Sequence, residues 1–173
     1  MAAALALFHA EGFGQVTMEH IARAAGVSRR TVYRRFPTKE HIVLEVPKRW
    51  LAVWDAAVAE RPGARPLEVA EAASLAVARH IDANRSDVLA AYAALAESPA
   101  LSSTGAANDA WIARIVALLR REPGRLSPAT QHVIAGAYLG AIDGMMSQWV
   151  KSGGRGSVYR STRALLARLR PIW

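Results

Sequence analysis

The feature that most constrains this fold is a pair of short helical segments joined by one glycine turn. The first segment, residues 18–25, follows Thr17, whose hydroxyl can accept hydrogen bonds from the free N–H groups at a helix start. Gly26 suits the left-handed backbone that ends a helix, and Ser28 can cap a second segment over residues 29–36. Two helices linked so closely predict a helix-turn-helix unit.

The apolar residues of this unit are spaced to form a small core, which Phe8 and Phe13 can close from a preceding helix over residues 2–11. The residues that we expect in this core are Ile21, Ala22, Ala25, Val27, Val32 and Phe36. The other side is basic, since the stretch from Arg23 to Lys39 holds six basic residues and no acidic residue. Arg side chains form bidentate hydrogen bonds with guanine edges, so the second helix has the composition of a recognition helix for double-stranded DNA.

Residues 5–42 resemble the DNA-binding signature of the TetR/AcrR family of transcriptional regulators. The resemblance rests on a turn, a helix end and a following segment, which read Ala25-Gly26-Val27-Ser28, Tyr33-Arg34-Arg35-Phe36 and Pro37-Thr38-Lys39-Glu40. It implies that four hydroxyl-bearing residues contact DNA phosphates, namely Thr17, Ser28, Thr31 and Tyr33. It also implies that Lys39 adds its charge at a phosphate, and that bases or the DNA backbone are faced by Arg29, Arg30 and Arg34.

Two departures from the family pattern bear on DNA binding. Position 30 is often glycine in the family and is Arg30 here, so we expect an altered operator or an added backbone contact. The family usually has a basic arm before the first helix, whereas no Lys or Arg precedes Arg23. Either the arm is missing from this chain, or the start is internal, or the DNA affinity is weaker than usual.

The remainder of the chain also follows a helical pattern, because alanines are abundant and aliphatic residues recur at intervals of three and four. Clusters of glycine, proline and serine divide it into helices over about 38–60, 66–83, 87–96, 107–121, 128–150 and 158–169. The prediction is an all-α fold, with a three-helix DNA-binding head over residues 1–45 and a helical body over residues 46–173. No run of apolar residues is long enough to span a membrane.

The resemblance implies that the body binds a small-molecule effector. Aromatic, sulfur-containing and polar side chains on several predicted helices are candidates to line a pocket for an apolar or aromatic ligand: Trp50, Trp54, His80, Tyr92, Asn108, Trp111, Asp143, Met146 and Trp149. For any one of these residues taken singly, a place in the ordinary core is the favoured interpretation, and only the set as a whole indicates a pocket. Asp143 could equally be a structural carboxylate.

The resemblance also implies a homodimer, since a two-fold symmetric operator needs two DNA-reading heads. Gly136, Gly140 and Gly144 recur every four residues on one face of the predicted helix over residues 128–150. Glycine disfavours a helix by roughly 1 kcal/mol, so three in register indicate the close approach of another helix. The candidates for the dimer interface are these glycines together with Val158, Leu165 and Leu169. Close packing inside one subunit is the alternative.

Several classes of chemistry find no support in the sequence. The absence of cysteine removes disulfides, thiolate zinc sites and cysteine nucleophiles, and it fits a reducing compartment. The five histidines show no metal-ligand spacing, and there is neither a phosphate-binding loop nor a nucleophile elbow. We therefore expect no enzyme activity, no cofactor and no metal. The apolar start lacks a basic segment and a cleavage site, which favours a cytoplasmic protein.

The sequence thus favours a ligand-responsive transcriptional regulator, a repressor in most members of the family, that an effector releases from DNA. Two alternatives remain open. One is a DNA-binding or structural helical protein with a filled body and no effector. The other is a small-molecule or protein-binding module whose DNA binding is weakened. A void among the four tryptophans of the body would favour the regulator, and solid packing would favour the effector-free protein: Trp50, Trp54, Trp111 and Trp149.

Overall fold

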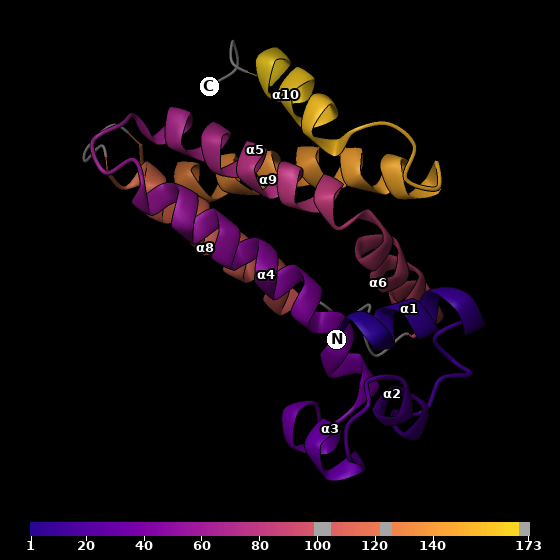
Figure 1. Ribbon diagram of the computed structural model, residues 1–173. Coiled ribbons are helices and arrows are strands. Elements are labelled where there is room, and N and C mark those ends of the chain that lie inside the picture. Colours follow the sequence, from indigo (N-terminus) through magenta and orange to yellow (C-terminus); the bar gives the residue numbers. More distant parts are fainter. Residues whose placement is uncertain (99–104, 122–125, 170–173) are drawn as a thin grey trace. The chain divides into compact units, whose positions relative to one another are not determined.

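The computed structural model describes residues 1–98, 105–121 and 126–169, and within these ranges every regular element is a helix (Figure 1). The helices are α1 Ala2–Glu11, α2 Met18–Ala24, α3 Arg29–Arg35, α4 Lys39–Ala59, α5 Pro66–Ala83, α6 Arg85–Glu97, α8 Gly105–Leu119, α9 Pro128–Lys151 and α10 Val158–Leu169. The predicted all-α fold is confirmed. None of the described helices is both long and apolar enough to cross a membrane.

The predicted helix borders differ from the observed ones by at most two residues, and α1, α5 and α10 match residue for residue. Local signals explain this agreement. At the start of α9, for example, Ser127 Oγ accepts a hydrogen bond from Thr130 N, and Pro128 follows at a position where no N–H is needed. Helix α4 continues through Pro47, although this proline has no N–H group and so removes one helical hydrogen bond.

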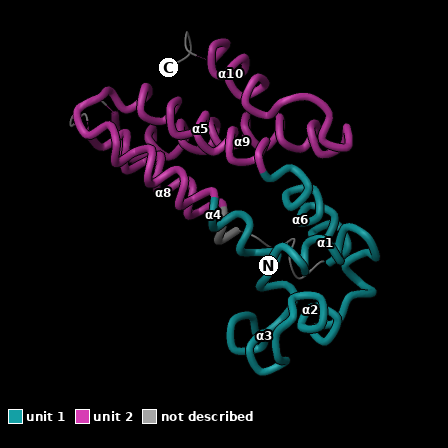
Figure 2. Tube along the Cα trace, viewed as in Figure 1, with its two compact units in different colours: residues 1–49, 84–104 teal, residues 50–83, 105–173 magenta. Residues whose placement is uncertain are grey.

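The chain divides into two compact units (Figure 2). Unit 1 contains residues 1–49 and 84–104, and unit 2 contains residues 50–83 and 105–173. The chain therefore passes from unit 1 to unit 2 within α4 and returns to unit 1 for α6. Unit 1 thus includes a helix that the predicted head over residues 1–45 does not contain. The predicted division into a DNA-binding head and a helical body is a division by function and not by compactness, and it stays a prediction.

In unit 1, α1 packs against α6 and against α2. On α1, Leu5 and Phe8 are buried, and the rings of Phe8 and Phe13 meet edge-on with 5.0 Å between their centroids. The far end of α6 is joined to the loop after α1, because Gly14 N donates a hydrogen bond to Glu97 Oε2 at 2.9 Å. Helix α6 is therefore part of the support on which the helix-turn-helix rests.

The core predicted for the helix-turn-helix forms in part. Three of its members are buried as expected, namely Ile21, Ala22 and Val32. Phe36 is half-buried. The placement of Ala25 and Val27 in this core is wrong, since both are exposed, Val27 by 43%. Both residues lie in the turn between α2 and α3, where the side chains leave the buried faces of the two helices.

In unit 2, α5 packs against α8 and α10, and α9 packs against α8 and α10. A hydrogen-bonded group of three residues joins α5 to α9 in the interior. Ser74 Oγ and Tyr138 Oη lie 2.8 Å apart, and Tyr138 Oη also donates to Ala70 O at 3.3 Å. The two helices therefore share a polar contact in the interior of unit 2.

A carboxylate on α5 fixes the start of α10. Asp82 accepts hydrogen bonds from Ser157 Oγ at 2.6 Å, from Val158 N at 2.8 Å and from Tyr159 N at 3.0 Å. A carboxylate at a helix start pairs with N–H groups that the helix leaves free, and its charge is favourable at the positive end of the helix dipole. The last described helix is thus held to α5 by its first turn.

Candidate DNA-binding surface and ligand cavity

Side-chain caps fix the geometry of the two helices that would meet DNA. Thr17 Oγ1 accepts a hydrogen bond from His20 N (3.2 Å) at the start of α2. Ser28 Oγ accepts one from Thr31 N (3.2 Å) at the start of α3. Between the two helices Gly26 has a φ of +66°, a conformation that any side chain would disfavour. The predicted caps, the glycine turn and the helix-turn-helix unit are confirmed.

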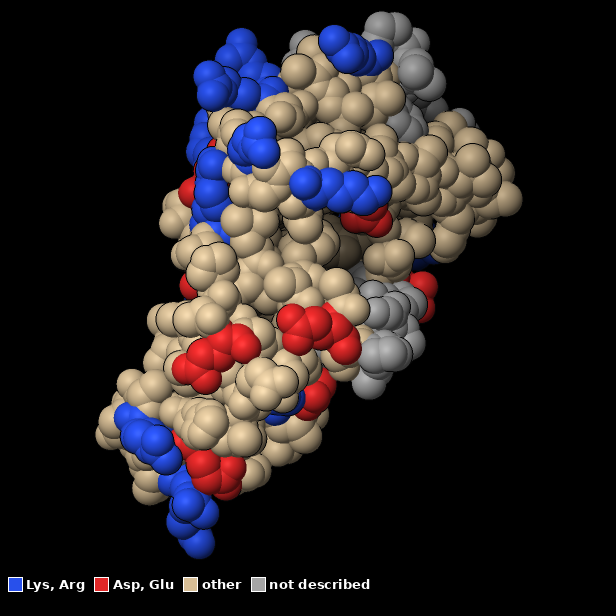
Figure 3. Space-filling model, turned by 90° about the vertical axis from the view of Figure 1, so that its right-hand side faces the viewer, with Lys and Arg blue, Asp and Glu red and all other residues tan. Residues whose placement is uncertain are grey.

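One face of α3 is exposed to solvent and is rich in basic groups, while Val32 packs inward with only 6% of its surface exposed. The exposed residues of α3 are Arg29, Arg30, Thr31, Tyr33, Arg34 and Arg35. Neither Arg30 nor Arg34 forms a hydrogen bond or an ion pair with another described residue, so both guanidinium groups are available to a partner. Figure 3 shows Lys and Arg side chains gathered at the end of unit 1 that holds α2 and α3. Their contact with DNA stays a prediction.

Sequence reasoning missed an acidic neighbour of the recognition helix. Glu19 on α2 accepts a hydrogen bond of 3.4 Å from the Tyr33 hydroxyl, and its Oε1 lies 3.8 Å from Arg29 Nη1. The Arg29 side chain is 73% exposed, so this ion pair contributes well under about 1 kcal/mol to stability. Its effect is geometric, because Glu19 orients two side chains of the face that would meet DNA. The only sequence signal for this role of Glu19 was its position in the first turn of α2, two residues after the Thr17 cap.

Lys39 has partners inside unit 1. Its Nζ donates to Phe13 O at 2.6 Å, to Val16 O at 3.1 Å and to Gly14 O at 3.4 Å. The ammonium also lies 4.4 Å from the centroid of the Phe13 ring, within the range of a cation–π contact. Lys39 therefore joins the start of α4 to the loop before α2. The phosphate contact expected of it stays a prediction.

The predicted pocket residues are spread over both units. Tyr92 belongs to unit 1, and the other eight belong to unit 2. Within unit 2 the buried members are Trp54, Met146 and Trp149. The half-buried members are Trp50, His80 and Trp111, and the exposed members are Asn108 and Asp143. The rings of Trp54 and Trp111 pack edge-on, with 5.6 Å between their centroids. Loss of water around its carboxyl raises the pKa of Asp143.

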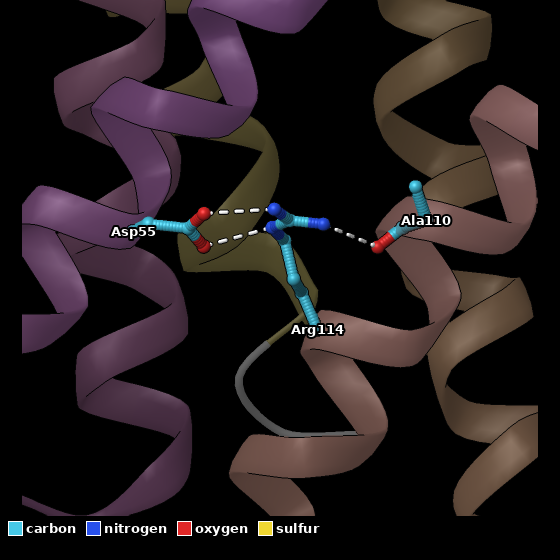
Figure 4. A network of polar contacts seen from close by, with 3 residues as sticks. All are labelled: Asp55, Ala110 and Arg114. Atoms are coloured by element: carbon cyan, nitrogen blue, oxygen red, sulfur yellow. Dashed lines mark hydrogen bonds and ion pairs between the residues drawn. The ribbon is translucent and has the colours of Figure 1, made fainter.

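Next to this ring pair an ion pair links α4 to α8 (Figure 4). Arg114 donates from Nε to Asp55 Oδ1 at 2.8 Å and from Nη2 to Asp55 Oδ2 at 2.7 Å, and its Nη1 donates to Ala110 O at 3.2 Å. The two parallel hydrogen bonds raise the pKa of Arg114, so the guanidinium stays charged at all relevant pH values. All three guanidinium nitrogens therefore have an acceptor.

Unit 2 contains a cavity of about 120 Å³ between α5, α8 and α9. Its lining is apolar except for one arginine and one tyrosine: Arg65, Pro66, Leu67, Ala70, Ile115, Leu118, Leu119, Leu126, Ile134 and Tyr138. A second hollow of about 300 Å³ lies between α8 and α9, lined by Asp109, Ile112, Ala113, Val116, Arg120 and His132. None of the nine residues predicted for a pocket lines either space. The one sequence signal for the cavity was Tyr138, an aromatic residue on the long predicted helix.

The glycine face of α9 has no partner within the described part of the subunit. Gly140 and Gly144 are exposed and Gly136 is half-buried, and a Cβ built on any of them would meet no described atom within 4 Å. Val133 lies on the same face and is 71% exposed. On α10, Val158 is buried inside the subunit, whereas Leu165 and Leu169 are half-buried. Their predicted place in a dimer interface is not decided by a single subunit and stays a prediction.

Comparison with known proteins shows which family and which solved structures the chain is similar to. Residues 1–46 match the sequence model of the bacterial regulatory proteins of the tetR family. Among curated proteins, no sequence matches the chain. The fold is similar to that of FadR from Thermus thermophilus, a transcriptional repressor solved in complex with lauroyl-CoA. The identity is 24%, the match covers 97% of this chain and 89% of that chain, and the TM-score is 0.71.

Two further structures show the same fold. FadR from Bacillus halodurans, a fatty acid degradation regulator, is 15% identical, with 97% of this chain and 94% of that chain covered and a TM-score of 0.74. The regulator PfmR from Thermus thermophilus is 23% identical, with 95% and 93% covered and a TM-score of 0.62. The predicted resemblance is thus confirmed for the N-terminal residues by sequence and for the chain by its fold.

Proposed function

We propose that this chain, a TetR-family protein by its N-terminal sequence and its fold, is a ligand-responsive transcriptional regulator that binds a two-fold symmetric operator as a homodimer. The observation that carries the proposal is α3. Ser28 caps it and Val32 anchors it, while four arginines, a threonine and a tyrosine of the helix are exposed. A helix of this composition fits the major groove of B-DNA, where base edges are distinguishable.

In this proposal Arg29 and Arg30, in the first turn of α3, reach base edges or the nearby backbone. Hydroxyl groups hold phosphates and so set the position of the helix: Thr17, Ser28, Thr31 and Tyr33. Phosphate contacts position a protein on DNA, whereas base contacts provide sequence preference. The expected operator is therefore specified mainly by the arginines, and Arg30 is the residue that distinguishes it from operators of relatives with glycine at this position.

The exposed face of α9 supports the homodimer. Gly136, Gly140 and Gly144, with Val133 beside them, form a smooth face that no described residue of the same subunit covers. The same face on a second copy could approach closely about a two-fold axis, as isologous interfaces require. Two heads would then meet two half-sites of an operator.

The proposal that the protein responds to an effector rests on the cavity of unit 2 and on the TetR-like fold. One structural relative was solved with lauroyl-CoA, so a protein of this fold can bind a ligand that carries an acyl chain. We propose a repressor that acts in the cytoplasm and leaves DNA when its effector binds. The effector must bind the DNA-incompetent state more tightly, because equal affinity for both states would shift nothing.

The experiment that tests DNA binding is selection of bound duplexes from a random pool, followed by a salt titration of the enriched sequence. We expect a two-fold symmetric motif, an affinity that falls steeply with salt, and a complex with two chains per duplex. Arg30→Ala should weaken or change the selected motif. Arg121→Ala, at an exposed arginine just after α8, is the matched control. Equal losses in both variants, or no enriched motif, would contradict the proposal.

One observation favours the alternative of a DNA-binding protein without an effector. Trp54 and Trp149 are buried, the Trp54 and Trp111 rings are in contact, and no tryptophan lines either of the two spaces found among the described residues of unit 2. These side chains act as core. Release of operator DNA by added lauroyl-CoA would exclude this alternative, since an effector-free protein would stay bound.

A further inference from the structure

The cavity between α5, α8 and α9 has a chemistry that limits what it can hold. Eight of its ten lining residues are aliphatic, alanine or proline, and they come from the three helices and the segment just before the last of them. Ala70, Ile115 and Leu118 are buried, so the inner wall is dry and apolar. An apolar cavity of this kind takes up an apolar group in preference to water.

Its size sets a limit on that group. The volume is about 120 Å³, whereas an engineered apolar cavity of about 150 Å³ in another protein holds one benzene molecule. The cavity therefore suits an apolar group of about six carbon atoms. A lauroyl chain has about twice as many carbons, so part of it would lie outside this space.

The polar group on the inner wall is already occupied. Tyr138 Oη lies 2.8 Å from Ser74 Oγ and donates to Ala70 O. Burial raises the pKa of Tyr138, so its hydroxyl is neutral under all physiological conditions. The inner end of a ligand thus meets no charge and no group that lacks a partner, which again favours an apolar end.

The outer end of the cavity is different. Arg65 is the one charged residue in the lining, and its side chain forms no hydrogen bond or ion pair with another described residue. It directly precedes Pro66, the first residue of α5, so the positive end of a long helix dipole adds to its charge. A planar guanidinium matches a carboxylate through two parallel hydrogen bonds.

We infer that the cavity binds a small amphipathic carboxylic acid, with an apolar group of about six carbons among Ala70, Ile115 and Leu118 and its carboxylate at Arg65. The inference rests on the proposed function only in naming this molecule as the effector. Binding itself requires only the cavity and the arginine.

The test is isothermal titration calorimetry on the full chain with hexanoate, 1-hexanol and hexylamine, which share one apolar group. We expect hexanoate to bind about two- to five-fold more tightly than hexanol, because the acid gains an ion pair with the exposed Arg65. Hexylamine should bind least, because its ammonium group is repelled by the same arginine. Laurate and inorganic phosphate test whether a longer chain, or the anionic end alone, is what binds.

Two variants assign the site. Arg65→Gln should remove the preference for hexanoate over hexanol and leave the affinity for hexanol unchanged. Arg61→Gln, at an exposed arginine just after α4, is the matched control and should keep the preference. Ala70→Leu fills the cavity and should abolish binding of both molecules. Leu67→Trp, at a half-buried lining position, serves the same purpose if Ala70→Leu lowers the melting temperature.

The results that overturn the inference differ from those that overturn the proposed function. Hexanol binding as tightly as hexanoate, a preference that survives Arg65→Gln, binding that survives both filling variants, or phosphate competing with hexanoate for an exposed site would each overturn the inference. Release of operator DNA by lauroyl-CoA without any hexanoate binding would overturn it and leave the regulator in place. Hexanoate binding in a chain that selects no DNA motif would support the inference and remove the regulator.

Discussion

Helix α3 and the cavity of unit 2 use the same residue type in opposite ways. On α3 the arginines stand on the outside of a short capped helix, and only Val32 is buried. In unit 2 a single arginine stands at the edge of an apolar space. In the proposed function, the first arrangement would bind a surface through several charged contacts, whereas the second would select a molecule by its size and by one charge. The proposed DNA-binding surface therefore depends on a few exposed side chains and on little buried surface. The cavity depends almost wholly on how the surrounding side chains pack.

The largest expected effect is on operator binding, and it is produced by substitution of Tyr33 on α3. Tyr33→Ala should weaken operator binding by about ten-fold or more, because a hydrogen bond to a charged phosphate is lost. Tyr33→Phe removes only the hydroxyl and should lose most of that amount. Fluorescence anisotropy with labelled operator measures both, and sedimentation should show an unchanged mass. Wild-type affinity in Tyr33→Phe would mean that the ring, and not the hydroxyl, meets DNA.

The cavity side of the comparison is tested at Tyr138. Tyr138→Phe leaves Ser74 Oγ and Ala70 O without this partner in the interior, so the free energy of unfolding should fall by about 1–2 kcal/mol. Operator affinity of the folded protein should not change. Urea denaturation gives the free energy, with Tyr159→Phe as the control, because the Tyr159 hydroxyl accepts from Arg79 at the exposed surface. A fall of the same size in the control would show that burial is not the cause.

A smaller effect is expected where α4 and α8 are linked. Asp55 and Arg114 are 52% and 31% exposed, so their ion pair is screened by solvent and should contribute less than about 1 kcal/mol. A double-mutant cycle with Asp55→Asn and Arg114→Gln, followed by urea denaturation, measures the coupling. A coupling energy near zero would mean that the Trp54 and Trp111 rings hold the two helices without help.

The smallest effect concerns Glu19. Glu19→Gln removes a negative charge beside Arg29 and Tyr33, so nonspecific DNA affinity should rise by about two- to three-fold at low salt. The gain should vanish at high salt, where charges are screened. Glu45→Gln, which removes an acid paired with Lys48 on α4, is the control. A gain in Glu19→Gln that persists at high salt would indicate a change in geometry instead of charge.

The two regions also differ in how far the sequence predicts them. The caps at Thr17 and Ser28 and the turn at Gly26 are local signals, because each acts on a backbone group within three residues. The helix-turn-helix could therefore be predicted almost to the residue. The exceptions are Ala25 and Val27, which are exposed instead of buried, and contacts between elements, such as the Lys39 ammonium on the Phe13 carbonyl and the Glu19 carboxylate beside α3.

The cavity could not be predicted in this way. Its walls come from residues 65–70, 115–119 and 126–138, and each stretch taken alone has the pattern of an ordinary helix facing a core. The tryptophans were predicted to line a pocket because their side chains are large and aromatic. Large side chains fill space, however, and Trp54 and Trp111 pack on one another. A cavity forms where small and medium side chains leave a gap, and such a gap depends on the angles between helices.

The return of the chain to unit 1 for α6 has a consequence for recombination. Helix α1 buries Leu5 and Phe8 within unit 1, where it packs against α6, and α6 follows the first stretch of unit 2 along the chain. A chimera that exchanged only residues 1–49 would bring a foreign α1 onto the resident α6, and the two apolar surfaces would have to fit by chance. DNA-binding specificity in this protein should therefore be transplanted by grafting the outer side chains of α3, or by moving both pieces of unit 1 together.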